Sequence, residues 1–180
     1  YDRQSFTDEK QLSADHIVLR KSGDGLAWGS VYVQYTLPID EIRSASNGLS
    51  IARRWEITKG EAWQPLADGS TVDAGATLRQ VITISADRDL DFVSVKASRP
   101  AGLEPLTALS GYDWESGAYH AVRDASDEYF YRKFPKGKLT FTVEGRAMRI
   151  GTFRSGLVRA QSQYAPEYNA FVPSFTLTVK

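Results

Sequence analysis

The sequence contains no cysteine, only one methionine and only two histidines among its 180 residues. The lack of cysteine excludes disulfides, thiolate zinc sites and thiol nucleophiles within this chain. No run approaches the about 18 apolar residues of a membrane-spanning helix, so we expect no direct membrane insertion by this chain. The 22 basic and 22 acidic residues cancel, and this balance argues against nucleic acid as a partner.

The length predicts one domain, because domains average about 150 residues. The first residues, YDRQSFTDEKQLSAD, are polar and carry no secretory signal. We interpret the chain as a piece of a longer protein. Residues 1–14 are expected to be a linker or the end of a preceding domain, and residues 15–180 a single domain.

Alternating apolar and polar residues dominate the chain and predict β-strands. Short turn signals such as Asp68-Gly69 and Pro135-Lys136-Gly137 separate the runs, without a long helical pattern. We therefore predict an all-β fold, an antiparallel β-sandwich, with at most one short helical turn at PIDEI (38–42). The predicted strands are 16–21, 28–35, 49–58, 77–85, 92–98, 118–124, 128–134, 138–150, 156–164 and 174–180.

Candidate catalytic and metal-binding residues are few. His16 and His120 are far apart in the sequence and are more simply strand residues. The acidic cluster at 87–91 (DRDLD) contains an arginine and lacks calcium-loop spacing, so we interpret it as a charged hairpin turn. The cluster at 124–128 (DASDE) is interpreted as a turn closed by Asp and Ser side chains. With no nucleophile elbow or phosphate loop, we predict no catalytic residue, no metal and no cofactor.

Aromatic residues make up 12% of the chain. They fit either the core and edges of a sandwich or a platform for sugar rings or a protein partner. A carbohydrate-binding or adhesive module that uses Trp63, Tyr112 and Trp114 is therefore an alternative function. The full set of candidates is Trp28, Tyr32, Trp55, Trp63, Tyr112, Trp114 and Tyr119.

Three collinear stretches, at 25–35, 63–114 and 134–168, carry a resemblance to a known family. Their most specific pieces are ADRDLDFVSVK (86–96), Glu104-Pro105 to Ser110-Gly111-Tyr112, Pro135-Lys136-Gly137, Gly151-Thr152-Phe153 and Tyr164-Ala165-Pro166-Glu167. Together they resemble the C-terminal macroglobulin-like domain of bacterial alpha-2-macroglobulins.

The resemblance implies a non-catalytic domain of a protease trap built from β-sandwich domains and a helical thioester domain. It implies that this domain packs on the helical domain and holds the trap in its native state until a protease cuts the bait region. The implied partners are other domains of the same chain, and target proteases reached through the whole protein. The implied location is the periplasm or the cell envelope.

The contact that the resemblance implies lies at Gln163, Tyr164, Ala165, Pro166 and Glu167. Pro166 fixes its own φ and restricts Ala165, so we expect it to present Tyr164 in a set direction. The other interpretation is that Tyr164 only caps the sandwich.

The family usually has methionine where this chain has Gln163, so a flexible apolar side chain has become a polar amide. Two alternatives stay open. The longer protein either keeps a thioester, or it has lost the bond and works by steric trapping or scaffolding.

Overall fold

The computed structural model describes residues 5, 18, 20–29 and 36–180, and the chain divides into two units, 1–36 and 37–180. The described residues of the first unit belong to no helix or strand. Half of the predicted strand 16–21 and most of the predicted strand 28–35, including His16 and Tyr32, lie outside the described residues. The single domain predicted for 15–180 thus stays a prediction over its first part. No helix within the described positions has the length and apolar character needed to cross a membrane.

The second unit is all-β, as predicted, and eight predicted strands between 49 and 180 are found there. The short strands β1, β3, β4, β7, β8 and β14 were not predicted, and the predicted run 138–150 ends earlier, before a separate strand β12. In chain order the strands are β1 (Ala45–Asn47), β2 (Leu49–Lys59), β3 (Ala62–Leu66), β4 (Thr71–Val72), β5 (Thr77–Ala86), β6 (Leu90–Ser98), β7 (Leu103–Pro105), β8 (Gly111–Asp113), β9 (Ala118–Arg123), β10 (Ser126–Phe134), β11 (Gly137–Ala147), β12 (Gly151–Arg154), β13 (Val158–Ser162), β14 (Asn169–Val172) and β15 (Thr176–Val179).

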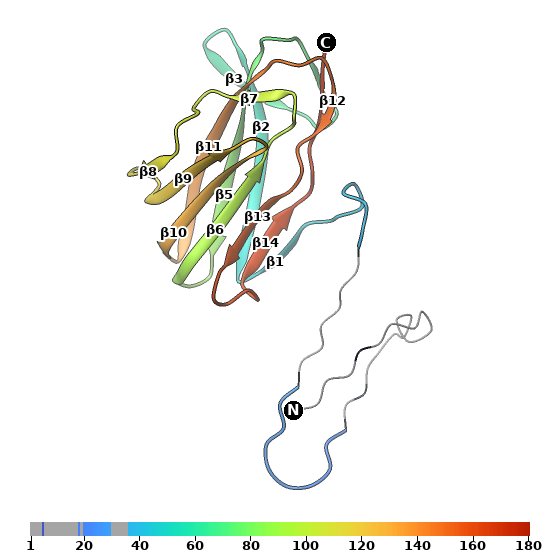
Figure 1. The fold of residues 1–180 in the computed structure, drawn as a ribbon, viewed down its shortest axis with the longest axis vertical. Coiled ribbons are helices and arrows are strands. Elements are labelled where there is room, and N and C mark those ends of the chain that lie inside the picture. The colour runs from blue at the N-terminus through green and yellow to red at the C-terminus, as the bar shows by residue number, and fades with distance from the viewer. Residues whose placement is uncertain (1–4, 6–17, 19, 30–35) are drawn as a thin grey trace. The chain divides into compact units, whose positions relative to one another are not determined.

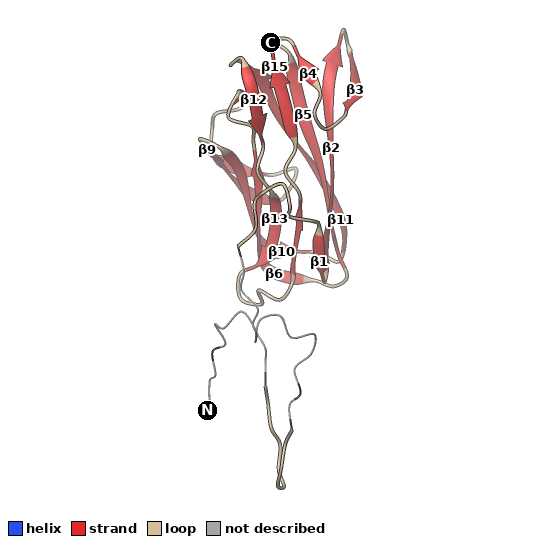
Figure 2. Cartoon of the chain, turned by 90° about the vertical axis from the view of Figure 1, so that its right-hand side faces the viewer, coloured by secondary structure: helices blue, strands red, loops and turns tan. Residues whose placement is uncertain are grey.

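Twelve strands form one sheet that folds over into two facing layers (Figures 1 and 2). The sheet order is β7-β11-β5-β2-β1-β14-β13-β6-β10-β9-β8, and β3 pairs with β2. The segment β7-β11-β5-β2 makes one layer, and β14-β13-β6-β10-β9-β8 makes the other. A small sheet, β12-β15-β4, lies at the end of the sandwich near the C-terminus (Figure 2). All pairs are antiparallel except β15 with β4.

Two apolar cores hold these layers together. The larger core packs Ile82 and Ile84 of β5 against Val93 and Val95 of β6. The alternating side chains of each strand reach this core from one face, as the pleat requires. The smaller core lies under the small sheet, where Trp55 stacks on Phe175 with ring centroids 4.8 Å apart. Trp55 is therefore a core residue and not part of an exposed platform.

One local prediction was wrong and another agrees with the structure. Residues 87–89 are not a hairpin turn, because both edges of β5 are already paired, with β2 and β11, and the chain crosses to β6 in the other layer. The PIDEI segment forms a single turn, closed by the Glu41 N–H donating to the Pro38 carbonyl at 3.0 Å, in agreement with the prediction of at most one short turn there. Forming one turn fixes several residues for a single hydrogen bond, so a turn of this length does not extend into a stable helix by itself.

Candidate functional site

The five residues of the predicted contact lie together in the loop between β13 and β14, at the lower end of the sandwich in Figure 1. Backbone hydrogen bonds give this loop a defined shape. The Ser162 N–H donates to the Tyr168 carbonyl at 3.0 Å, and the Tyr168 N–H donates to the Ala165 carbonyl at 2.9 Å. The Gln163 N–H donates to the Phe92 carbonyl at 2.9 Å, which ties the loop to β6.

Side chains from neighbouring strands hold the far end of the same loop. The Asn47 amide donates to the Glu167 carbonyl at 2.8 Å, and the Asn169 amide donates to the Pro166 carbonyl at 2.8 Å. Next to them, the Arg88 guanidinium donates to the Tyr168 hydroxyl at 3.0 Å. The loop is therefore attached at both ends, and its middle is exposed at the surface.

Tyr164 occupies that middle position. Its side chain is 81% exposed, although it is a large aromatic residue. Its ring meets the Phe92 ring edge-on, with centroids 5.1 Å apart and an angle of 89°. This T-shaped geometry is one of the favoured arrangements for two aromatic rings, so Tyr164 stands at the surface in a defined direction.

Phe92 was not singled out in the sequence, although a signal was available. In FVSVKAS, Val93, Val95 and Ala97 are the inward positions, and Phe92 is therefore a large apolar residue at an outward position. The structure shows it 44% exposed and with a positive φ of 50°.

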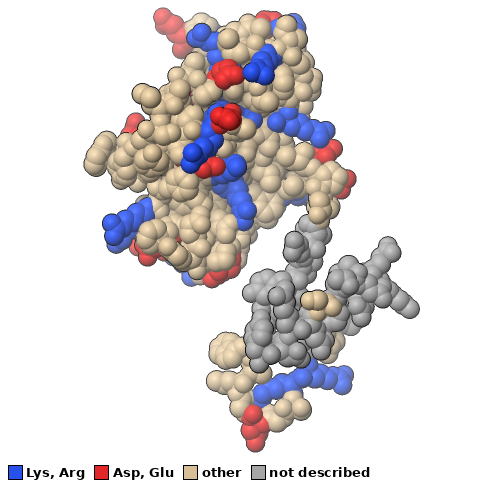
Figure 3. All heavy atoms as spheres, in the orientation of Figure 1, with Lys and Arg blue, Asp and Glu red and all other residues tan. Residues whose placement is uncertain are grey.

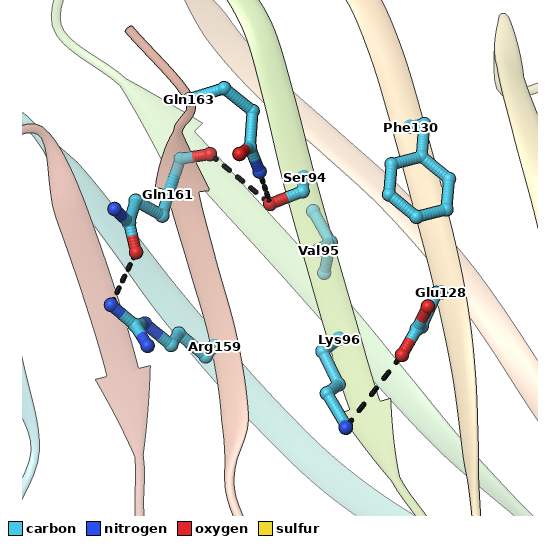
Figure 4. A pocket seen from close by; sticks show the side chains of 8 residues that line it. All are labelled: Ser94, Val95, Lys96, Glu128, Phe130, Arg159, Gln161 and Gln163. Atoms are coloured by element: carbon cyan, nitrogen blue, oxygen red, sulfur yellow. Dashed lines mark hydrogen bonds and ion pairs between the residues drawn. The ribbon is translucent and has the colours of Figure 1, made fainter. Parts of the chain in front are cut away.

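The exposed Gln163 side chain lies over the outer face of the sheet. Its amide donates to the Ser94 hydroxyl at 2.5 Å, at the rim of a shallow hollow of about 270 Å³ over β13, β6 and β10 (Figure 4). In the hollow, Lys96 lies 3.7 Å from the Glu128 carboxylate, and Arg159 donates to the neutral Gln161 amide oxygen. Figure 3 shows basic and acidic side chains close together over the middle of this face.

A row of exposed aromatic side chains continues from this hollow across three strands. Phe130 of β10 pairs with Tyr119 of β9, and Tyr119 pairs with Tyr112 of β8. The Tyr112 ring lies 4.7 Å from the Trp114 ring. On the other side, Phe130 pairs with Ser94, so the row and the hollow form one surface.

Trp63 is not part of this row. It lies on β3, which pairs with β2 in the other layer, and the Arg79 guanidinium stacks 4.1 Å from its ring centroid. The structure therefore brings Tyr112 and Trp114 together but separates Trp63 from them.

His120 lies at the edge of a buried network of polar side chains. Its Nε2 lies 2.8 Å from one carboxylate oxygen of Asp127, and Arg99 donates to the other. Arg99 and Asp127 are 3% and 1% exposed. Asp127 is thus a buried strand residue, and the prediction that the 124–128 acidic side chains close a turn was wrong for it. Across the described positions, no three His, Asp or Glu side chains are grouped to hold a metal ion.

A comparison with protein families supports the resemblance. The model of the family described as the bacterial alpha-2-macroglobulin MG10 domain matches residues 48–167, which include the whole 163–167 loop. A search of curated proteins found no match.

Several solved structures of bacterial alpha-2-macroglobulins contain a region with a similar fold. The Salmonella protein reacted with methylamine is 24% identical over 76% of this chain and 10% of its own, with a TM-score of 0.61. A native Escherichia coli fragment from domain MG7 to the C-terminus is 19% identical over 79% of this chain and 25% of its own, with a TM-score of 0.64. The trypsin-activated E. coli protein is 18% identical over 77% of this chain and 11% of its own, with a TM-score of 0.62. This chain therefore spans between a tenth and a quarter of their lengths.

Proposed function

We propose that this chain, which belongs to the family of bacterial alpha-2-macroglobulin MG10 domains, is a non-catalytic domain of a longer protease inhibitor. The inhibitor would act in the periplasm or at the cell envelope. The partners of this domain would be other domains of the same chain, and target proteases would be met only by the whole protein. The trypsin-activated state of an E. coli relative supports a response to proteases.

We further propose that the loop 163–167 contacts the helical thioester-type domain and holds the inhibitor in its native state. The observation that carries this proposal is Tyr164, which is exposed and yet fixed by the Phe92 ring and by the hydrogen bonds at both ends of the loop. A surface that must pack when closed and release when the protein rearranges is expected to be small, with an aromatic centre and a polar surround. Gln163 and Glu167 supply that surround.

The experiment that tests this contact compares Tyr164→Ala with Tyr164→Phe in the longer protein. We expect Tyr164→Ala to convert part of the protein to the open conformation without bait cleavage and to lower protease capture. Tyr164→Phe keeps the ring and should behave like the wild type. Ile150→Ala is the matched control, because Ile150 is also exposed but lies on the turn before β12. Unchanged conformation and capture in Tyr164→Ala, alone and combined with Glu167→Ala, would refute the contact.

A separate measurement decides what the contact would protect. Methylamine treatment of the longer protein followed by intact-mass analysis and thiol titration detects a live thioester; a Salmonella relative was reacted with this amine. A mass gain with release of one thiol would make the loop the guard of that bond. No mass gain would mean that Gln163 accompanies a lost bond and that the protein acts by steric trapping alone.

The exposed aromatic row favours a second candidate function, carbohydrate binding. Tyr112, Tyr119 and Phe130 lie on adjacent strands and present rings on one face, as a platform for sugar rings would require. A tryptophan fluorescence titration with a panel of polysaccharides tests this. Saturable quenching that Tyr112→Ala abolishes, and that Trp63→Ala on the other layer does not, would favour it. Flat titrations across the panel would rule it out.

A further inference from the structure

The backbone of Phe92 is unusual for a large side chain. Among the residues that the structure describes, it is the one non-glycine residue with positive φ, at 50°. This left-handed conformation is disfavoured for L-residues and is an outlier for a bulky one. Such conformations persist when the surrounding structure holds them, and they concentrate at functional positions.

Burial does not explain this conformation. The next inward residues of β6, Val93 and Val95, are almost completely buried, whereas Phe92 is 44% exposed. A glycine at this position would allow the same backbone at no steric cost. The stability of the sandwich therefore offers no reason for a phenylalanine here.

The conformation does have a consequence at the loop 163–167. The Phe92 carbonyl accepts the Gln163 N–H at 2.9 Å, and the carbonyl of the preceding Asp91 accepts the Ser162 hydroxyl at 3.2 Å. The loop thus begins against the irregular backbone of β6. The Phe92 ring then stands edge-on to Tyr164 at 5.1 Å. The Phe92 backbone fixes where the loop starts, and the Phe92 ring fixes the direction of the Tyr164 side chain.

We propose that Phe92 is the positioning residue of the contact, and that its left-handed backbone is kept because it aims the ring that orients Tyr164. This inference rests on the proposed function of the loop. An aromatic side chain that is oriented before it meets its partner loses less conformational entropy on packing. No charged side chain takes part in the Phe92–Tyr164 pair, so the partner surface that fits it is apolar, within the helical domain.

The test uses Phe92→Gly, because glycine accepts the backbone conformation and removes only the ring. We expect the urea midpoint of the chain to stay unchanged or to rise. We expect the Tyr164 ring signals in aromatic NMR spectra, assigned with Tyr164→Phe, to move to the positions of exposed tyrosines. Phe130→Ala removes another exposed ring from the same face and should leave these signals in place.

In the longer protein, Phe92→Gly should raise the ratio of open to native protein without bait cleavage by about 2- to 10-fold. This is the change in an equilibrium constant expected for the loss of one aromatic pair. Combined with Tyr164→Ala, it should add nothing further, since it acts through Tyr164. A purely structural role predicts the opposite pattern, with a lower urea midpoint and additive effects.

Two results would overturn the inference. One is a Tyr164 spectrum that Phe92→Gly leaves unchanged. The other is an unchanged opening in Phe92→Gly while Tyr164→Ala opens the protein. If Tyr164→Ala itself has no effect on opening, the proposed function of the loop fails instead, and the NMR spectrum alone decides whether Phe92 orients Tyr164.

Discussion

Gly48 lies directly against the ring of Tyr168, and a Cβ on Gly48 would come within 2.3 Å of Tyr168 Cδ1. The contact joins the β1–β2 connection to the end of the loop that presents Tyr164. No side chain larger than hydrogen fits there without moving the tyrosine, which Arg88 also holds through its hydroxyl.

Gly48→Ala should therefore destabilise the chain by roughly 2–4 kcal/mol, from overpacking together with a left-handed backbone. Gly60→Ala is the matched control. Its φ of +64° resembles the +66° of Gly48, but the space around it is empty, so about 1 kcal/mol is expected from the backbone alone. Urea unfolding of both variants measures the difference. Equal losses would show that the Tyr168 ring yields without cost.

Asp127→Asn should cost about 3–5 kcal/mol, because it leaves the buried Arg99 guanidinium without its counter-charge. The neighbouring Glu128→Gln is the control. Glu128 pairs with Lys96 at 3.7 Å and Arg123 at 3.6 Å at the surface, and such pairs contribute less than about 1 kcal/mol. Urea denaturation at neutral pH compares the two. Similar losses would contradict the assignment of Asp127 as the centre of a buried network.

The acid sensitivity of the fold should depend in part on Glu56. Hydrogen bonds from Arg54 at 2.8 Å and Arg79 at 2.6 Å lower the pKa of the Glu56 carboxyl below its ordinary 4.5. Because the folded pKa is the lower one, this stabilisation is present above the unfolded pKa and is lost as the pH falls through the folded pKa.

Glu56→Gln should therefore lower the urea midpoint at about pH 6. The difference between the midpoints at about pH 6 and about pH 3 should become smaller than in the wild type. Glu61→Gln, on the exposed turn after β2, makes no ion pair with any described residue and should keep the wild-type difference. A gap as large in Glu56→Gln as in the wild type would show that other carboxyls determine the acid response.

Phe175→Ala should cost about 3–5 kcal/mol, the range for truncating a buried aromatic residue. Phe175 is 4% exposed and stacks on Trp55, so the loss should come with a shift in tryptophan fluorescence. Phe130→Ala, on the exposed row, should change stability by less than about 0.5 kcal/mol. If Phe175→Ala behaved like Phe130→Ala, the small core would contribute little.

The longer strands were predictable because alternation over nine or more residues is a strong local signal. β11 shows it over its length, with Leu139, Phe141 and Val143 on the inward face. Of the shorter strands, β9, β13 and β15 were predicted, whereas others such as β1 and β8 were not. β1 is three exposed residues, Ala45–Asn47, and β8 is three residues, Gly111–Asp113. They are strands only because a neighbouring strand supplies their hydrogen-bond partners.

One part of the candidate site was likewise predictable from the sequence, and another part was not. Residues 163–167 are consecutive, so the sequence alone sufficed to name them, and the restriction that Pro166 places on the chain is local. Phe92 belongs to a distant strand and meets Tyr164 only because β6 pairs with β13. Trp63 was grouped with Tyr112 and Trp114 because the sequence does not reveal which strands share a layer.

The sequence by itself thus determined the all-β class, the family and the loop that carries Tyr164, since all three depend on residue types and their order along the chain. The tertiary structure decided which strands are neighbours, that Asp127 and Arg99 are buried together, and that Phe92 stands against Tyr164. The physical reason is that successive side chains of a strand point to opposite faces, so the alternation of apolar and polar residues can be read from each strand alone. Strand pairing instead depends on which distant segments bury their apolar faces together.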